Sequence, residues 1–214
     1  MSRRLKELLD YWWEKGIVED EKVLSAFQKV KREIFVPPEL VEEAYSDMAL
    51  PIGHEQTISQ PTTVALMTQA LELRKGQKVL EIGAGSGYQA ALLAHIVGKN
   101  GRVVSTEIIS ELVALARRNL LRAGVKNVIL VRTDGSEGYA KEAPYDRIIM
   151  TAASPQIPLH LLAQLKDGGI LLAPVGGSLG QSMIRVRKLK GGKLSEENLG
   201  EYIFVPLRGK KGFD

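Results

Sequence analysis

The stretch VLEIGAGSG, residues 79–87, decides the fold that this chain can adopt. Its apolar start is typical of a buried strand, and a helical pattern begins directly after it. Between them, Gly83, Gly85 and Gly87 lack a Cβ atom, so the backbone can turn sharply and a bulky ligand can lie against it. A strand, a glycine turn and a helix in this order predict a cofactor of the adenosine type at the end of the strand.

The glycine spacing separates two classes of cofactor. Dinucleotide folds space their glycines as G-x-G-x-x-G and hold a pyrophosphate at a helix N-terminus, whereas the spacing here is G-x-G-x-G. Glu81 comes two residues before Gly83, and its carboxylate, which we expect to face the ligand, would repel a pyrophosphate but tolerate the sulfonium and ammonium groups of S-adenosylmethionine. The segment resembles the first motif of the class I methyltransferases, which convert this cofactor to S-adenosylhomocysteine. We therefore expect the cofactor to be bound by Glu81, Gly83, Ala84, Gly85 and Gly87.

The chain between residues 76 and 175 alternates strand-like runs with helical patterns. Such alternation predicts an α/β fold with a doubly wound, mostly parallel sheet, the fold of the class I S-adenosylmethionine-dependent methyltransferases. Sheets of this kind bind ligands at the carboxyl ends of their strands, where the glycine turn lies. The predicted strands are 79–82, 102–107, 128–132, 147–151 and 170–174, and the predicted helices are 87–97, 110–123 and 158–165.

Two further parts complete a single predicted domain over residues 1–214, in which 76–175 is the cofactor-binding core. In the N-terminal helical part, 1–75, Ser59 is a candidate N-cap for a helix that starts near Pro61. In the C-terminal part, 176–214, we expect antiparallel strands to extend the sheet. The predicted N-terminal helices are 3–14, 20–31, 38–45 and 61–72, and the predicted C-terminal strands are 182–189 and 199–207, joined by a turn at 190–193.

Two more acidic positions follow predicted strands. Glu107 ends the second strand, 20 residues after Gly87, where an acid can accept hydrogen bonds from both ribose hydroxyls. Asp134 and Gly135 follow the third strand; Asp-Gly is also a common turn dipeptide, but in class I methyltransferases an acid here accepts a hydrogen bond from the adenine amine. We therefore add Glu107, Asp134 and Gly135 to the predicted cofactor site.

The composition excludes several kinds of chemistry. The chain has no cysteine, which excludes disulfides, thiolate metal sites and a cysteine nucleophile, and we predict no metal site. The formal net charge of +4 comes from scattered basic residues interleaved with acids, which favours a solvated surface over a nucleic-acid partner. No apolar run approaches the roughly 20 residues of a membrane span, and the first residues lack the apolar core of a signal peptide. We therefore expect a cytoplasmic protein without nucleic-acid or membrane partners.

A polar loop, residues 52–61, precedes the predicted helix at 61–72 and reads IGHEQTISQP. Together with residues 79–91, this loop resembles the signature of the protein-L-isoaspartate (D-aspartate) O-methyltransferases. The resemblance runs over nearly the whole chain and continues through 134–135, 145–146, 151–153, 165–169, 174–176 and 204–207.

The resemblance implies methyl transfer from S-adenosylmethionine to the free carboxylate of L-isoaspartyl residues in damaged proteins and peptides, and leaves open whether D-aspartyl residues are accepted. The ester then closes to a succinimide, and hydrolysis returns part of it to aspartate. The substrate carboxylate is ionised at neutral pH, so the reaction needs no general base. Ser59 matches the family's active-site serine, and we expect its hydroxyl to hold the carboxylate. Thr57, His54 and Val205 are further predicted substrate-binding residues.

Other functions stay open for the same fold. An RNA methyltransferase could use the basic charge, although residues 151–155 read TAASP and lack the Asp/Asn-Pro-Pro-aromatic pattern of amino-group methyltransferases. A metal-dependent small-molecule methyltransferase would need clustered acidic or amide ligands. A binding module without catalysis would bind the cofactor but would not turn over an isoaspartyl peptide. For the isoaspartyl methyltransferase we expect a monomer.

Overall fold

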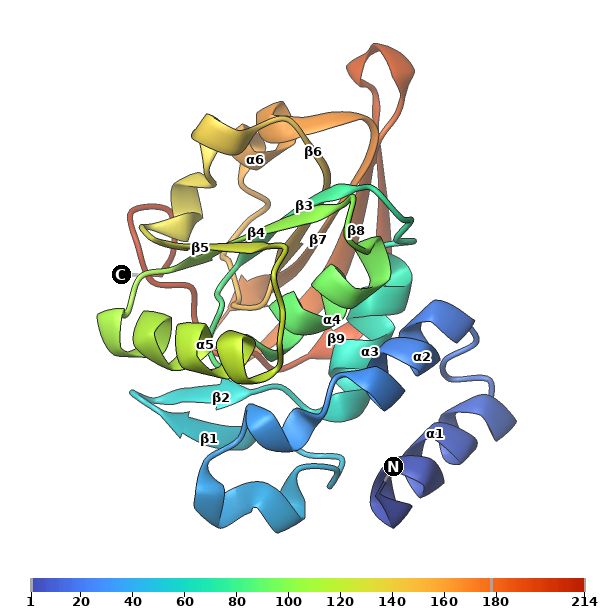
Figure 1. The fold of residues 1–214 in the computed structure, drawn as a ribbon. Helices are drawn as coiled ribbons and strands as arrows, with labels where there is room; N and C mark the ends of the chain where they lie inside the picture. Colours follow the sequence, from blue (N-terminus) through green and yellow to red (C-terminus); the bar gives the residue numbers. More distant parts are fainter. Residues whose placement is uncertain (1, 178, 214) are drawn as a thin grey trace.

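A computed structural model describes residues 2–177 and 179–213. Its main sheet has seven strands in the order β5-β4-β3-β6-β7-β8-β9 (Figure 1). The first five strands in this order are parallel, and β8 and β9 are antiparallel additions. This arrangement confirms the predicted fold class. The strands are β3 (Lys78–Ile82), β4 (Arg102–Glu107), β5 (Val128–Arg132), β6 (Tyr145–Met150), β7 (Leu165–Gly177), β8 (Gly180–Lys188) and β9 (Leu194–Tyr202).

The strand order places the glycine turn at the reversal point of the sheet. The chain leaves β3 toward β4 and β5, and then returns to the other side of β3 as β6. Doubly wound sheets bind their ligands at the carboxyl ends of the strands beside such a reversal. The four residues 79–82 at the end of β3 are buried, as expected for a central strand covered on both faces.

Helices cover both faces of the sheet (Figure 1). Alternate residues of β3 point to opposite faces, so Val79 joins the apolar cluster under α4 (Tyr88–Val97) and α5 (Ser110–Arg122), while Leu80 joins the cluster under α6 (Leu159–Gln164). Two short 3₁₀ turns, η3 (Gly135–Glu137) and η4 (Ala140–Glu142), precede β6. Within the described residues, no helix is long and apolar enough to cross a membrane.

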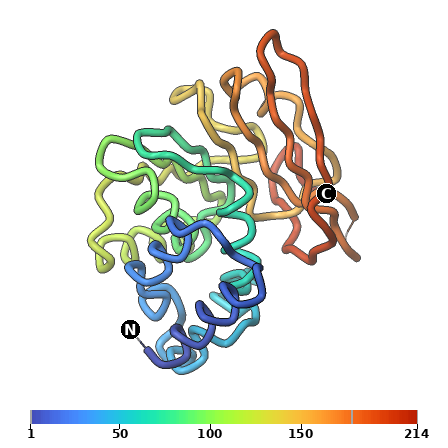
Figure 2. Tube along the Cα trace, turned by 90° about the vertical axis from the view of Figure 1, so that its right-hand side faces the viewer, coloured from blue at the N-terminus to red at the C-terminus, as the bar shows by residue number. Residues whose placement is uncertain are grey.

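The N-terminal part packs against α4 and lies far from the tip of the β8–β9 hairpin (Figure 2). Two of its features differ from the sequence prediction: the helix expected at 38–45 is a 3₁₀ helix, and the polar loop contains a β-hairpin. The elements are α1 (Arg3–Glu14), α2 (Glu21–Lys29), η1 (Arg32–Ile34), η2 (Pro38–Glu43), β1 (Leu50–Gly53), β2 (Gln56–Ile58) and α3 (Pro61–Ala70).

The last strand is also not where the sequence placed it. We expected a strand at 199–207, but β9 covers 194–202 and a 3₁₀ turn, η5 (Lys190–Gly192), precedes it. Strand β9 is mostly exposed, so burial imposes no apolar alternation on it. Besides the backbone ladder, Arg185 and Ser182 of β8 donate to its Glu197 and Glu201 side chains. The chain leaves the strand after Tyr202 and makes an isolated bridge between Pro206 and Ala153.

Candidate active site

The glycine turn after β3 has the sharply turned backbone that its sequence predicts. Gly83, Gly85 and Gly87 have φ angles of 97°, 52° and 87°, a region that other residues rarely adopt. Thr151, which follows β6, fixes the start of the turn because its hydroxyl donates to the carbonyl of Gly83 at 2.6 Å. A Cβ atom at Gly83 would lie only 2.5 Å from the Thr151 hydroxyl oxygen. Glycine is therefore required here by both conformation and packing.

Glu81 lies in β3 with its side chain fully buried, where we had expected it to face the ligand directly. Ser105 of β4 donates a hydrogen bond to Oε2, and Oε1 has no hydrogen-bond partner among the described residues. Burial raises the pKa of Glu81 to about 8, and the negative charge of Glu107 acts in the same direction. Oε1 is thus an acceptor that the described residues leave unused, and the contact of Glu81 with the cofactor stays a prediction.

Glu107 ends β4 beside the turn, as predicted. Its Oε2 accepts from the backbone N–H of Gly85 at 2.9 Å, and its Oε1 accepts from Ile108 and Ile109 at 2.9 and 3.0 Å. A carboxylate has about four acceptor positions, so these bonds leave about one. Glu107 thus keeps about one acceptor position for a ribose hydroxyl, and its bonds to both hydroxyls stay a prediction.

Asp134 and Gly135 follow β5 and contact the end of the chain. The carboxylate of Asp134 accepts from the backbone N–H of Ser136 and from that of Lys210, both at 2.9 Å. Burial by itself would raise the pKa of Asp134, but these hydrogen bonds lower it below its ordinary value. Gly209 passes so close that a Cβ atom there would lie 2.1 Å from Oδ1. The C-terminal segment therefore lies against the predicted adenine position.

Three of the predicted cofactor residues, Gly83, Glu107 and Gly135, line a small cavity of about 40 Å³. Its described lining does not include Glu81, Ala84, Gly85, Gly87 or Asp134. The chemistry of this set fits S-adenosylmethionine, because carboxylates suit its cationic and ribose groups and a glycine backbone permits close approach. The cavity has room for about one water molecule. Gln56 of the β1–β2 hairpin and residues 206–208 are part of its lining. These segments are joined by an ion pair between Arg208 and Glu55 at 2.9 Å.

A larger groove of about 790 Å³ lies beside the turn, and its size suits a small ligand or a stretch of peptide. Its lining includes hydroxyl and amide groups from the segment that leads into α3, and residues 201–205. Thr151, which fixes the glycine turn, also lines the groove, so the groove and the predicted cofactor site meet at this residue. The polar lining residues between β2 and the first turn of α3 are Thr57, Ser59, Gln60, Thr62 and Thr63.

Ser59 lines this groove but does not cap α3, so the N-cap expectation was wrong. Helix α3 begins at Pro61, and the side chain of its N-cap residue, Gln60, makes no capping bond. Asp47 satisfies the first turn instead, because its Oδ1 accepts from the backbone N–H of Thr62 at 2.9 Å. The Ser59 hydroxyl is therefore not used as the cap of α3.

Of the three other predicted substrate-binding residues, two line the groove and one does not. Thr57 of β2 and Val205 both line the groove. Val205 lies beyond β9, and its carbonyl accepts from the backbone N–H of Ala153 at 2.8 Å, so only part of its backbone is left for a substrate. His54 forms the turn of the β1–β2 hairpin with φ 53° and is not among the described residues that line the groove. The functional roles of all three stay predictions.

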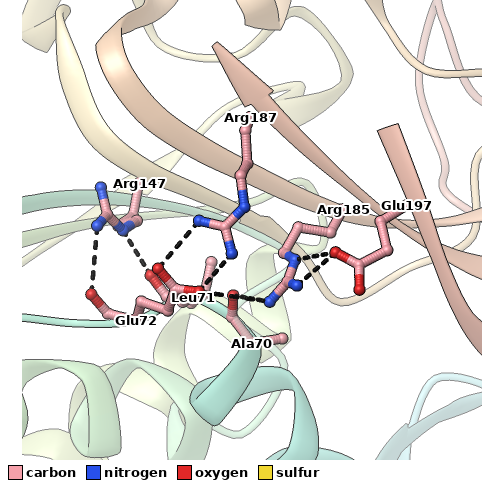
Figure 3. Close-up of polar contacts among 7 residues, drawn as sticks. All are labelled: Ala70, Leu71, Glu72, Arg147, Arg185, Arg187 and Glu197. Carbon is pink, nitrogen blue, oxygen red and sulfur yellow. Dashed lines mark hydrogen bonds and ion pairs between the residues drawn. The ribbon is translucent and has the colours of Figure 1, made fainter. Parts of the chain in front are cut away.

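The opposite end of α3 is held by arginines from the sheet (Figure 3). Arg147 of β6 donates to the carbonyls of Leu71 and Glu72, and Arg185 of β8 donates to that of Ala70 at 3.4 Å. Arg187 forms a two-bond ion pair with the Glu72 carboxylate. We call these three arginines and Glu72 the arginine clamp. It satisfies carbonyls that the end of a helix leaves unpaired, and its positive charge complements the helix dipole.

Comparison with known proteins assigns the family. A model of the protein-L-isoaspartate(D-aspartate) O-methyltransferase family matches residues 3–212, which include the glycine turn, the groove and the arginine clamp. The chain belongs to this family. Among relatives of that name, the protein of Methanosarcina mazei is 52% identical over 92% of this chain and 81% of its own length. That of Methanopyrus kandleri is 46% identical over 100% of this chain and 92% of its own length.

Solved structures of isoaspartyl methyltransferases have the same fold. A chain from Plasmodium falciparum, solved with S-adenosyl-L-homocysteine, has a TM-score of 0.84 and 25% identity, over 95% of this chain and 97% of that one. Another protein-L-isoaspartate O-methyltransferase has a TM-score of 0.82 and 34% identity, over 96% of this chain and 66% of that one. The likeness covers the N-terminal part and the C-terminal strands as well as the cofactor-binding core.

Sequence reasoning missed two residues that shape the site. Thr151 was noted only as part of a matching segment, although its position directly after a central strand was a usable signal. Asp47 carried no signal, because its partners, Gln60 and Thr62, lie 13 and 15 residues further along the chain. A contact of this length becomes visible only when the segment before β1 is folded against α3.

Proposed function

We propose that this protein transfers the methyl group of S-adenosylmethionine to the free carboxylate of L-isoaspartyl residues in damaged proteins and peptides, which starts their repair. The observation that carries the proposal is the junction at Thr151 between the glycine turn and the Ser59 groove, in a chain of the isoaspartyl methyltransferase family. The two sites open at the same edge of the sheet, so a cofactor on the turn and a carboxylate in the groove would meet.

The reaction needs little acid–base catalysis from the residues of this chain. When bound, S-adenosylmethionine supplies a methyl group on a positively charged sulfur. The substrate carboxylate is already ionised at neutral pH, so no residue has to remove a proton. The hydroxyls of Ser59 and Thr57 can donate to this carboxylate and aim one of its oxygens, because both residues line the groove. Catalysis then comes mainly from alignment of the reacting atoms and exclusion of water.

The test uses three matched peptides that carry isoaspartate, aspartate or asparagine at one position. With labelled S-adenosylmethionine, we expect base-labile label on the isoaspartyl peptide alone. A fourth peptide with D-aspartate decides whether that residue is also a substrate. Absence of label from all of the peptides, together with measurable cofactor binding, would contradict the proposal and favour an RNA or small-molecule substrate.

The proposal also takes the protein to act as a monomer. Light scattering at assay concentrations should give the mass of one chain, 23.5 kDa. The cytoplasmic location and the absence of nucleic-acid and membrane partners stay predictions from the sequence.

A further inference from the structure

Asp47 sits at the centre of a hydrogen-bond network at the start of α3. Its Oδ1 accepts from the backbone N–H of Thr62 at 2.9 Å. Its Oδ2 accepts from the Thr62 hydroxyl at 2.7 Å and from Nε2 of Gln60 at 3.0 Å. One carboxylate thus caps the helix and also holds a side chain that lines the substrate groove.

The direction of each bond in this network follows from the groups involved. Trp12 is fully buried, and its indole N–H, which can only donate, lies 2.8 Å from the Thr62 hydroxyl oxygen. The Thr62 hydroxyl therefore accepts from Trp12 and gives its own proton to Asp47. Because the ionised carboxylate only accepts, the amide of Gln60 must turn its NH₂ group to Asp47. The carbonyl oxygen of Gln60 then faces away from Asp47.

The backbone around Asp47 is itself anchored. Arg32 is fully buried, and its Nε donates to the carbonyl of Ala44 at 2.7 Å. The hydroxyl of Tyr45 donates to Glu33 at 2.6 Å. The segment that carries Asp47 is therefore fixed to η1 just before it reaches α3. A fixed carboxylate can impose one amide orientation on Gln60, which a mobile one could not.

We propose that Asp47 is a positioning residue that sets the amide orientation of Gln60, and that Gln60 binds a peptide group of the substrate beside the isoaspartyl residue. This inference rests on the proposed function, since it names the part of the substrate that the groove recognises. An amide matches a peptide group because its carbonyl oxygen accepts from an N–H and its NH₂ donates to a C=O. The neighbouring Ser59 is left for the carboxylate.

The test is a double-mutant cycle on the full chain. Asp47→Asn replaces an acceptor oxygen by an NH₂ group, so the Gln60 amide must flip to pair with it. We expect the KM for the isoaspartyl peptide to rise about fivefold, which corresponds to about 1 kcal/mol, with kcat changed less than twofold. Gln60→Ala should raise KM by a similar factor. In the Gln60→Ala background, Asp47→Asn should have no further effect on KM, since residues that act as a unit are not additive.

Two controls separate positioning from general stability. Asp20 caps α2 through the backbone N–H of Lys22 at 2.9 Å and does not line the groove. Asp20→Asn should lower the melting temperature about as much as Asp47→Asn while leaving KM unchanged. The affinity for S-adenosylhomocysteine, measured by calorimetry, should stay within twofold in every variant.

Three results would overturn the inference: additive effects of Asp47→Asn and Gln60→Ala on KM, an unchanged KM in Gln60→Ala, or an equal rise of KM in Asp20→Asn. Gln60 lies at the groove and caps nothing with its side chain, so Gln60→Ala decides the question even if Asp47→Asn does not fold. Failure of the proposed function itself would look different, because the wild-type protein would then not methylate the isoaspartyl peptide.

Discussion

The two ends of α3 are held by opposite charges and serve different purposes. At its start, the carboxylate of Asp47 accepts from Thr62 and reaches Gln60 in the groove. At its end, the arginine clamp ties the last carbonyls to the sheet (Figure 3), and its arginines lie outside the groove lining in the described part of the chain. Both charges complement the helix dipole. A favourable interaction between a charged side chain and the helix dipole can therefore accompany substrate positioning at one end of a helix and stability alone at the other.

The largest effect is expected at the groove end. Replacing Ser59 by Ala removes the hydroxyl that we expect to hold the substrate carboxylate in line with the methyl group, and a misplacement of about 1 Å costs about 100-fold in rate. Affinity for S-adenosylhomocysteine should stay within twofold, because Ser59 is not among the residues that line the small cofactor cavity. Steady-state kinetics and calorimetry measure the two quantities. A large loss of cofactor affinity would show that Ser59 contacts the cofactor and not the substrate carboxylate.

The next effect belongs to the clamp end and should appear in stability alone. Arg147 is buried and donates to the carbonyls of Leu71, Glu72 and Asp146. Arg147→Met would leave these acceptors without their donor, at a cost of about 2–3 kcal/mol, which lowers the melting temperature by about 5–10 °C for a chain of this size. Below that temperature, the KM for the isoaspartyl peptide should match wild type. Arg117→Met, at an exposed position on α5, is the matched control with little expected change. A raised KM in Arg147→Met would contradict the prediction that the clamp end of α3 affects stability alone.

A third measurement concerns the cofactor turn, which neither end of α3 should affect. A cationic ligand favours the ionised form of Glu81, whose pKa is raised to about 8 without ligand. The association constant for S-adenosylmethionine, divided by that of Glu81→Gln, should therefore rise with pH up to about 8 and then level off. The rise is at most about tenfold per pH unit. Arg147→Met should show the same profile as wild type. A ratio of association constants that does not change with pH would show that the ionisation of Glu81 does not affect cofactor binding.

The smallest effect concerns the Arg187–Glu72 pair of the clamp. The hydrogen bond from Arg187 lowers the pKa of Glu72 below its ordinary value. A lowered carboxyl pKa stabilises the fold above the unfolded-state pKa, and this contribution is lost as the pH falls through the folded-state value. Glu72→Gln should therefore be less stable than wild type at pH 7, by no more than about 1 kcal/mol because the pair is partly exposed. Urea unfolding at pH 7 and pH 3.5 should show the difference shrinking in acid. A difference that persists in acid would show that the charge of Glu72 is not what matters.

Local chemistry made much of this protein predictable from sequence. The turn at 83–87 needs residues without a Cβ atom, and the alternation of buried strands and helices that follows admits few folds other than a doubly wound sheet. The strands 102–107 and 128–132 are where the sequence placed them. The bounds of strand β9 escaped prediction because the strand is mostly exposed, so burial imposes no pattern on its side chains.

By itself, the sequence determined the strand and glycine turn at 79–87, the alternation of strands and helices in the core and the family to which the chain belongs, because these depend on short motifs and on regular burial. Only the tertiary structure decided which residue caps α3, how Glu81 is buried and which side chains hold the two ends of that helix. Asp47 reaches Gln60 across 13 residues and Arg185 reaches Ala70 across 115. Hydrogen bonds between such distant positions leave no periodic trace in the sequence, since they depend on how the folded elements pack.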